Sequence, residues 1–451
     1  MVLMTANLAM KETDQYLETF EGFEAQANQP AWIYPLRKAG IARFAELGFP
    51  TVQQEDWRFT NVAPIARLPF KPVFQVSRDR FTSEAVAEFT FGKLAANRLV
   101  FVDGHYAAGL SSSEPQQPGF VVSSLAAALA DDSGVIKAHL AQHAQGEGDA
   151  FTALNAAFFQ DGGFVYVSAG KQVEVPIHLL YISTAKEAGA AAHPRNLIIA
   201  EKASKVTVLE SYVSVAEASY FTNAVTDLVL GEGAVVEHVK FQDEGRNAFH
   251  IAAVHAYLGQ NCNFISHSIA TGARLSRNNI RTALAGEGVE CILNGLYLTR
   301  GDQLADHHMV VEHAQAHCNS HEYYNGILDG RSKGVFHGRI LVRPGAQKTD
   351  AKQTNKNLLL SEDATVDTKP QLEIYADDVK CTHGATVGQL NEEAIFYLRT
   401  RGLGVETARR MLIHAFAGEI IERIRHAPAR EELDKLVWER LERHPRVGEK
   451  R

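Results

Sequence analysis

The first part of the chain shows mainly a helical pattern of apolar positions. Apolar residues recur every three or four positions from Tyr16 to Ala27, and a second helical segment covers about 30–48. The run LVFVDGHY (99–106) predicts a hairpin of two short strands. A helical pattern of apolar positions resumes at Ser124 and ends near Asp161-Gly162-Gly163. We therefore expect residues 1–160 to form a mainly helical region with short strands.

From 161 to 385 the pattern changes to short β-branched and aromatic runs separated by glycine and asparagine, which are typical of strands and turns. A self-comparison finds an apolar residue followed four positions later by a small or apolar one. The second members are Ala203, Ala234, Cys262, Val289 and Ala346. They are 31, 28, 27 and 57 residues apart, the last interval being close to two steps. This period falls within the range of about 20 to 50 residues that is typical of stacked repeats.

Such a repeat predicts a mainly β core, a parallel coil of strands in which each turn buries its inward residues against the neighbouring turns. The helical segments on either side are expected to cover the two ends of the coil, because unpaired strands at an edge invite association. A two-sheet sandwich is the alternative, although sandwich strands have turns every 8 to 12 residues without a longer period.

Residues 386–451 return to a helical pattern. One apolar stripe runs from Ala408 to Ile424, and a further amphipathic segment covers 433–441. The apolar faces of these helices either pack against each other or leave a surface for another protein.

Cys381 and His383 lie between a predicted strand, 372–376, and a helix that starts at Asn391. We expect them where the strand gives way to a loop. Residues two apart in extended chain face the same side, so both side chains could meet one ligand. A thiolate and an imidazole suit iron-sulfur or zinc chemistry, but a cluster needs about four protein ligands. The remaining ligands must come from a distant segment or another subunit.

The composition limits which partners and which cell compartment are expected. The chain has 451 residues, with 45 basic and 53 acidic side chains, so nucleic acid is not the expected partner. The N-terminal sequence lacks the pattern of a secretory signal, and no window approaches the roughly 18 apolar residues of a membrane span. The four cysteines, Cys262, Cys291, Cys318 and Cys381, form no CxxC pair. We expect a cytoplasmic protein with reduced thiols, in which Cys262 and Cys291 are small core residues.

Motifs for catalysis are absent from the sequence. There is no GxxxxGK[ST], GxSxG or HExxH, so neither nucleotide hydrolysis nor another enzymatic activity is predicted for the chain itself. Potential metal ligands crowd between 306 and 321. They are Asp306, His307, His308, Glu312, His313, His317 and His321. Their spacing matches no metal motif, and alternation along strands favours hydrogen-bonded rows instead, so metal binding by this run stays open.

The stretch KTDAKQTNKNLLLSEDATVDTKPQLEIYADDVKCTHGATVGQLNEEAIFYLRTRGL (348–403) resembles the SufB/SufD family of iron-sulfur cluster assembly subunits. Weaker similarity covers FHGRILV, LTRGDQLADHHMVVEHA and the final helices, and QEDWRFTNV (54–62) resembles the family's N-terminal region. His383-Gly384-Ala385 favours the SufD branch, because SufB has His-Glu-Ala at the matching place.

This resemblance implies a right-handed parallel β-helix flanked by helical regions, acting as a non-ATPase scaffold. It implies a SufB partner bound through the β-helix core and the ATPase SufC bound through the C-terminal helices. The matching residues on those helices are Phe396, Tyr397, Arg399, Arg401 and Gly402. It also implies that His383, with Cys381, contributes ligands to a transient iron-sulfur cluster at the SufB interface, while this chain binds no nucleotide.

Two other functions remain open at this point. One is a β-helix interaction protein without a metal role, and the other is a carbohydrate-active β-helix enzyme, which would need acidic residues grouped along a groove. Whether the isolated chain forms a homodimer, and whether the complex holds a flavin, is also left open.

Overall fold

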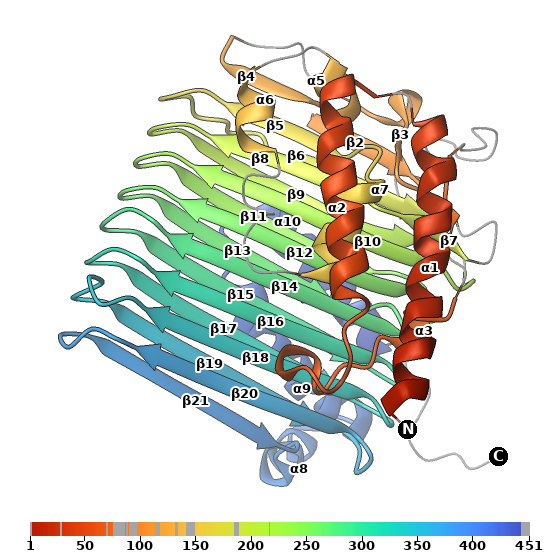
Figure 1. The fold of residues 1–451 in the computed structure, drawn as a ribbon. Helices are drawn as coiled ribbons and strands as arrows, with labels where there is room; N and C mark the ends of the chain where they lie inside the picture. Colours follow the sequence, from red (N-terminus) through yellow and green to blue (C-terminus); the bar gives the residue numbers. More distant parts are fainter. Residues whose placement is uncertain are drawn as a thin grey trace.

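The computed structural model describes residues 2–442 except 28, 69–70, 75–85, 87–88, 90–96, 113–117, 131–133, 141–148, 185–188 and 216. Its centre is a parallel β-solenoid of about 8 turns, with helices on two of its sides (Figure 1). From β8 to β21, each strand pairs in parallel with the strand two positions further along the chain. The predicted parallel β-helix is thus confirmed, and the alternative sandwich is not what the chain forms.

The solenoid is built from two sheets, which receive alternate strands of the repeat. Sheet A contains, in spatial order, β20 (Thr365–Ile374), β18 (Lys333–Val342), β16 (Leu304–His313), β14 (Leu275–Leu284), β12 (Phe249–Leu258), β10 (Phe221–Leu230), β8 (Arg195–Ala200), β5 (Gly163–Val167) and β4 (Phe120–Ser124), with β7 (Ala190–Ala192) beside β10 and β1 (Lys71–Pro72) beside β7. Sheet B contains β21 (Lys380–Gly388), β19 (Asp350–Leu359), β17 (Asn319–Leu328), β15 (Glu290–Thr299), β13 (Asn263–Ala270), β11 (Val235–Asp243), β9 (Lys205–Ser214), β6 (Ile177–Ser183), β2 (Asn97–Val102) and β3 (His105–Tyr106).

The period of the sequence repeat comes from the turn that leads from each strand of sheet A to the next strand of sheet B. There a residue with φ between 53° and 69° precedes a buried residue, after which the strand of sheet B begins. The positive-φ position holds Ala203, Gly233, Asn261, Gly288, His317 and Lys348, and the buried position holds Ser204, Ala234, Cys262, Val289, Cys318 and Thr349. Each positive-φ residue donates its N–H to a carbonyl of the next turn, at 2.7–3.4 Å. The repeat therefore reflects a positive-φ backbone conformation that each of these turns adopts, followed by a small buried side chain.

Two members of the predicted repeat are out of register. Ala203 occupies the positive-φ position rather than the buried one, and Ala346 lies three residues before the equivalent Thr349. The turn 343–349 is longer than the turn 231–234, which displaced the pattern. Cys318 is the copy that the comparison missed, and Cys262 is a buried core residue as expected.

The interior of the solenoid combines apolar packing with a row of buried polar groups. Glu210 accepts hydrogen bonds from the Tyr212 hydroxyl (2.7 Å) and from His238 Nε2 (3.0 Å). Lys240 Nζ lies 2.9 Å from His250 Nε2. Because buried polar groups are costly without partners, these contacts explain how charged side chains are tolerated inside the coil.

The N-terminal helices lie on the outer face of sheet A. They are α1 (Val2–Gln26), α2 (Tyr34–Leu47), α3 (Ala63–Ala66), α5 (Leu125–Ala130), α6 (Gly134–His139) and α7 (Ala150–Phe158), with the 3₁₀ turns η1 (Ala31–Ile33) and η2 (Glu55–Trp57). A further 3₁₀ turn, η4 (Ala108–Leu110), lies beside sheet B, where Leu110 packs against the apolar cluster of that sheet. Phe23 and Phe158 share one apolar cluster with Phe221 and Phe249 of sheet A. The predicted hairpin is β2–β3, whose turn residues Asp103 and Gly104 have φ of 48° and 85°.

The C-terminal helices α9 (Val405–Ile421) and α10 (Ala427–Glu442) lie on the opposite side, against the outer face of sheet B. Helix α8 (Glu392–Thr400) packs against α9. In α9, Ile413 and Ala417 share an apolar cluster with Leu296 and Ile327 of sheet B. We expected these helices to cover the end of the coil, and that was wrong, because the apolar face of α9 is buried against outward apolar residues on the flank of sheet B, while β21 stays exposed except at Cys381. Among the described residues, no helix is long and apolar enough to span a membrane.

Candidate functional site at the end of the β-solenoid

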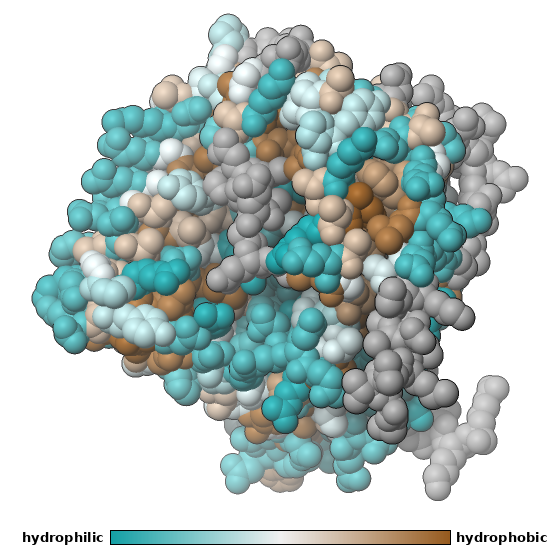
Figure 2. Space-filling model, viewed as in Figure 1, coloured by the Kyte–Doolittle hydropathy of each residue, from teal (hydrophilic) through white to brown (hydrophobic). Residues whose placement is uncertain are grey.

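The last turn of the solenoid, β20 and β21, is the end of both sheets. In the part of the chain that the structure describes, β20 pairs with β18 and β21 with β19, and each is the terminal strand of its sheet. Every residue of β21 except Cys381 is exposed. Hydrophilic and hydrophobic residues are both visible at the lower left of the space-filling view, where this end lies (Figure 2). The end of the coil thus presents open strand edges.

Cys381 and His383 lie within strand β21, rather than in a loop after a strand as expected. Their partners across the ladder are Ala351 and Gln353, which are both 1% exposed. Both side chains therefore continue the row of side chains that lines the solenoid interior. Within the described residues, no later turn covers this row. They share one face, as the spacing predicted.

The two side chains differ in accessibility. His383 is exposed, whereas Cys381 is half-buried and packs against a cluster that includes Val342 and Ala351. Burial, with a smaller contribution from Asp350, raises the pKa of the Cys381 thiol. The thiol is therefore mostly protonated at neutral pH, and the imidazole is the more available ligand of the two.

A buried carboxyl group lies deeper in the same column. Glu322 of β17, Gln353 of β19 and His383 of β21 occupy matching register positions. Burial raises the pKa of Glu322 to about 8. Gly338 of the facing sheet leaves room for the two deeper side chains, since a Cβ there would lie 2.8 Å from Gln353 Nε2 and 2.9 Å from Glu322 Oε2. Glu322 was not predicted from the sequence, because its inward direction depends on strand register.

Helix α8 presents the predicted partner-binding residues to solvent. Asn391 Oδ1 accepts hydrogen bonds from the N–H groups of Glu393 (2.8 Å) and Ala394 (3.1 Å), which starts the helix as expected. Phe396 and Tyr397 are 66% and 58% exposed.

The other three predicted residues continue this surface to the end of α8. Arg399 and Arg401 are exposed, and Arg401 lies over the Tyr397 ring, with its Cζ 5.1 Å from the ring centre. Gly402 has φ of 89° and ends the segment. Two large exposed aromatic rings beside cationic groups are unusual on a surface that faces only water.

The run of histidines between 306 and 321 does not converge on one site. His307 and His313 point into the solenoid, where they lie 3.3 Å from Ser268 Oγ and 2.8 Å from Ser320 Oγ. His317 fills a positive-φ turn position, and His321 pairs with Asp350 at 3.6 Å. His308 alone of these histidines joins a second group.

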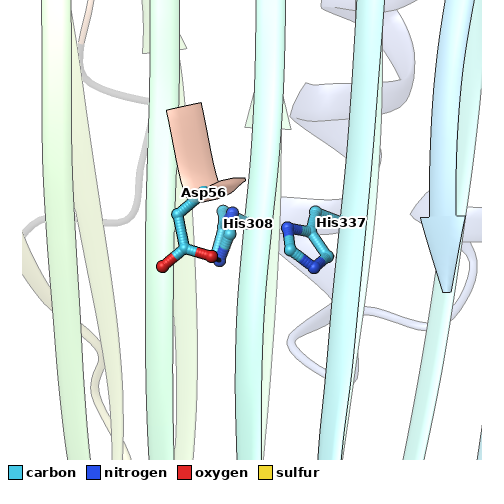
Figure 3. A group of neighbouring side chains, drawn as sticks. All are labelled: Asp56, His308 and His337. Atoms are coloured by element: carbon cyan, nitrogen blue, oxygen red, sulfur yellow. Dashed lines mark ion pairs between the residues drawn. The ribbon is translucent and has the colours of Figure 1, made fainter. Parts of the chain in front are cut away.

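That second group lies on the outer face of sheet A, beneath the η2 turn. His308 of β16, His337 of β18 and Asp56 of η2 have one ligand atom each within 4.8 Å of the others (Figure 3). Burial lowers the pKa of both imidazoles. Sequence reasoning missed Asp56 and His337, because 252 residues separate His308 from Asp56 and nothing in the spacing joins them.

Comparison with known proteins gives the family. The model of the SUF system FeS cluster assembly SufBD core domain matches residues 181–416, and that of the SufBD protein N-terminal region matches 10–179. The iron-sulfur cluster assembly protein SufD of Escherichia coli is 32% identical, covering 93% of this chain and 95% of that protein. An iron-sulfur cluster assembly SufBD family protein of Synechocystis is 31% identical over 93% and 94% of the two chains, and SufD of Bacillus subtilis is 25% identical over 93% and 96%. With both family models matched along nearly its whole length, the chain belongs to the SufBD family of iron-sulfur cluster assembly proteins.

Proposed function

We propose that this chain is a non-ATPase scaffold subunit that pairs with a SufB-type partner through β20 and β21 and supplies His383 to a cluster formed between the two subunits. The C-terminal helices hold the ATPase of the complex, SufC, through α8. The iron-sulfur cluster is the cargo of this assembly and leaves it for acceptor proteins. Among the described residues, the observation that carries the proposal is the exposed His383 on an uncovered terminal strand.

The open end of the solenoid supports pairing with another β-helix. A terminal strand has a row of backbone N–H and C=O groups available to a neighbouring strand, and natural proteins usually cover such an edge. The coil of a related subunit would continue both sheets and bury β20 and β21. His383 would then lie at the junction of two interiors rather than on an outer surface.

The ligand set fits transient rather than permanent binding. A cluster takes about four protein ligands, and His383 with the half-buried Cys381 provides at most two. The raised pKa of the Cys381 thiol makes it the weaker contributor, since the thiolate is the form that binds metal. A partner must complete the set, and a shared site can be opened when the subunits move.

Anaerobic cluster reconstitution in the assembled complex tests the proposal. Replacing His383 with alanine should reduce iron-sulfur absorption and bound iron at least tenfold, while the three subunits still co-purify. Cys381→Ala should have a smaller effect, because its thiol is protonated and packed.

The matched control is His321→Ala, since His321 is a second histidine of sheet B, partly exposed and outside the register position that His383 shares with Gln353 and Glu322. Wild-type cluster formation in the His383→Ala complex would contradict the ligand role. It would favour the second candidate, a β-helix interaction subunit without a metal role, because the exposed edge would then serve assembly alone.

A further inference from the structure

The group formed by Asp56, His308 and His337 has the composition and spacing of a transition-metal site. Its three ligand atoms lie within 4.8 Å of one another, and His308 Nε2 is 3.8 Å from Asp56 Oδ1. Ligands bound to one ion at about 2.0–2.2 Å lie roughly 3 to 4 Å apart. Small rotations of the side chains would therefore bring all three onto one ion.

The two histidines are held in place by burial. His308 is 5% exposed and His337 is 4% exposed, and they lie on neighbouring strands with ring centres 4.2 Å apart. His308 Nδ1 has no hydrogen-bond partner among the described residues, which is uncommon for a buried polar atom. His337 Nε2 lies 3.3 Å from Gln371 Oε1, a contact of the kind that orients ligating imidazoles.

Neighbouring contacts fix the backbone that carries Asp56. Arg277 Nη1 donates to the Asp56 carbonyl at 2.8 Å, and the Arg277 guanidinium lies 3.7 Å from the centre of the Trp57 ring. Thr60 donates to Asp306 at 2.5 Å. The η2 turn is thus held against sheet A at Asp56 and at the residues that follow it, although the Asp56 side chain itself is 47% exposed.

Three cationic groups near the three residues are paired with carboxylates. Arg277 binds Asp306 at 2.6 Å, Lys369 binds Glu55, and Arg339 lies 2.9 Å from Glu373. These pairs reduce the repulsion that an incoming cation would meet. Asp56 remains as the carboxylate that faces the two imidazoles (Figure 3).

We propose that Asp56, His308 and His337 form a binding site for a first-row divalent transition metal, of the Fe²⁺ or Zn²⁺ kind. Two imidazoles and one carboxylate are a common ligand set for these ions and leave coordination positions open to water. The exposed carboxylate lets the ion enter from solvent. The bound ion would join the N-terminal region to the solenoid across two strands of sheet A.

Titration of the metal-free full chain with Co²⁺ under anaerobic conditions tests this site, because Co²⁺ bound by nitrogen and oxygen ligands absorbs visible light. The titration is made in the His383→Ala background, so that the proposed cluster ligand does not contribute and failure of either proposal can be recognised separately. We expect one Co²⁺ per chain. Asp56→Asn and His337→Gln should each weaken binding by about 100-fold or more, since even the loss of an outer contact costs 10- to 100-fold.

His321→Gln is the matched control, because His321 also faces an aspartate, Asp350 at 3.6 Å, but has no third ligand in the described group. It should bind Co²⁺ as the parent does. Asp56→Asn keeps the size of an exposed side chain, so its fold should be intact, which far-ultraviolet circular dichroism checks. Undiminished Co²⁺ binding in Asp56→Asn and His337→Gln, or no binding in the parent, would overturn the proposal.

Discussion

At the scale of single residues, the tightest constraints in the solenoid come from pairs in adjacent turns. Gly295 of β15 lies opposite Tyr324 of β17, and Tyr297 lies opposite Gly326 in the same ladder. Both tyrosines are fully buried. Each ring occupies the space where its glycine partner would otherwise have a side chain. These glycines are needed for close packing and not for an unusual backbone angle.

Replacing Gly326 with alanine should therefore lower the free energy of unfolding by about 1–3 kcal/mol, because the new methyl group overlaps the Tyr297 ring in a closely packed interior. Gly345→Ala is the control, since a Cβ there meets no atom within 4 Å. Urea unfolding of both variants measures the difference. Equal stability of the two variants would show that the interior can adapt to the added group.

Glu322 gives a pH dependence with a definite sign. Its pKa is about 8 in the folded chain and 4.5 when unperturbed, so the folded state holds the proton over a range in which the unfolded state has lost it. The stabilisation that this group contributes is fully present below about pH 4.5. It is lost as the pH rises towards 8, by at most about 1.4 kcal/mol per pH unit. Glu322→Gln removes the titration, so the free energy of unfolding of this variant relative to wild type should increase from pH 5 to pH 8.

Chemical unfolding at several pH values measures this advantage. The exposed Glu362 provides the control, because Glu362→Gln should follow the wild-type pH dependence. An advantage of Glu322→Gln that stays constant with pH would mean that Glu322 is ionised inside the folded chain.

The candidate ligands show which site residues can be predicted from a sequence and which cannot. Cys381 and His383 were found because they are two residues apart in one strand, where alternation alone places them on one face. Asp56, His308 and His337 come from three separate segments, and only strand register and the docking of η2 bring them together. Contacts of that kind leave no local pattern in the chain.

At the scale of elements, the strands and most helices could be predicted from local patterns, but the exact repeat position could not. The turn between the sheets requires a positive φ, which Gly233 and Gly288 adopt easily. The same position also holds His317 and Lys348, whose identity gives no such signal. The backbone hydrogen bonds to the next turn fix this conformation, and so the period is clearer in the structure than in the residue types.

Helix α8 makes a prediction at this scale about ATPase binding. Phe396 and Tyr397 are exposed on a helix that the rest of the chain holds through Ile395. Phe396→Ala and Tyr397→Ala should each weaken binding of the ATPase at least tenfold, because exposed aromatic side chains commonly dominate the energy of an interface. Isothermal titration calorimetry with the purified ATPase measures the change.

Tyr257→Ala provides the control for this prediction. Tyr257 is an exposed aromatic residue on β12 of sheet A, on the other side of the solenoid from the C-terminal helices. Its loss should leave ATPase affinity unchanged. Equal weakening by all three substitutions would show that the effect does not come from a contact at α8.

At the scale of the whole molecule, the two helical regions cover opposite flanks of the solenoid (Figure 1). Among the residues that the structure describes, they leave its C-terminal end open. The sequence indicated that helices would cap this end, because unpaired strands at an edge invite association. Which surface a helix covers depends on where apolar side chains gather in three dimensions, and sheet B offers them on its flank. An uncovered end next to His383 is the feature that joins the fold to the proposed function.

An anaerobic structure of the assembled complex, with anomalous scattering measured at the iron edge, tests this account most directly. We predict that β21 lies against the partner's terminal strand and that an iron signal appears within bonding distance of the His383 imidazole. The remaining ligands of that iron should come from the partner. An iron signal bound only by other residues, or a complex in which β21 still faces solvent, would contradict the central claim.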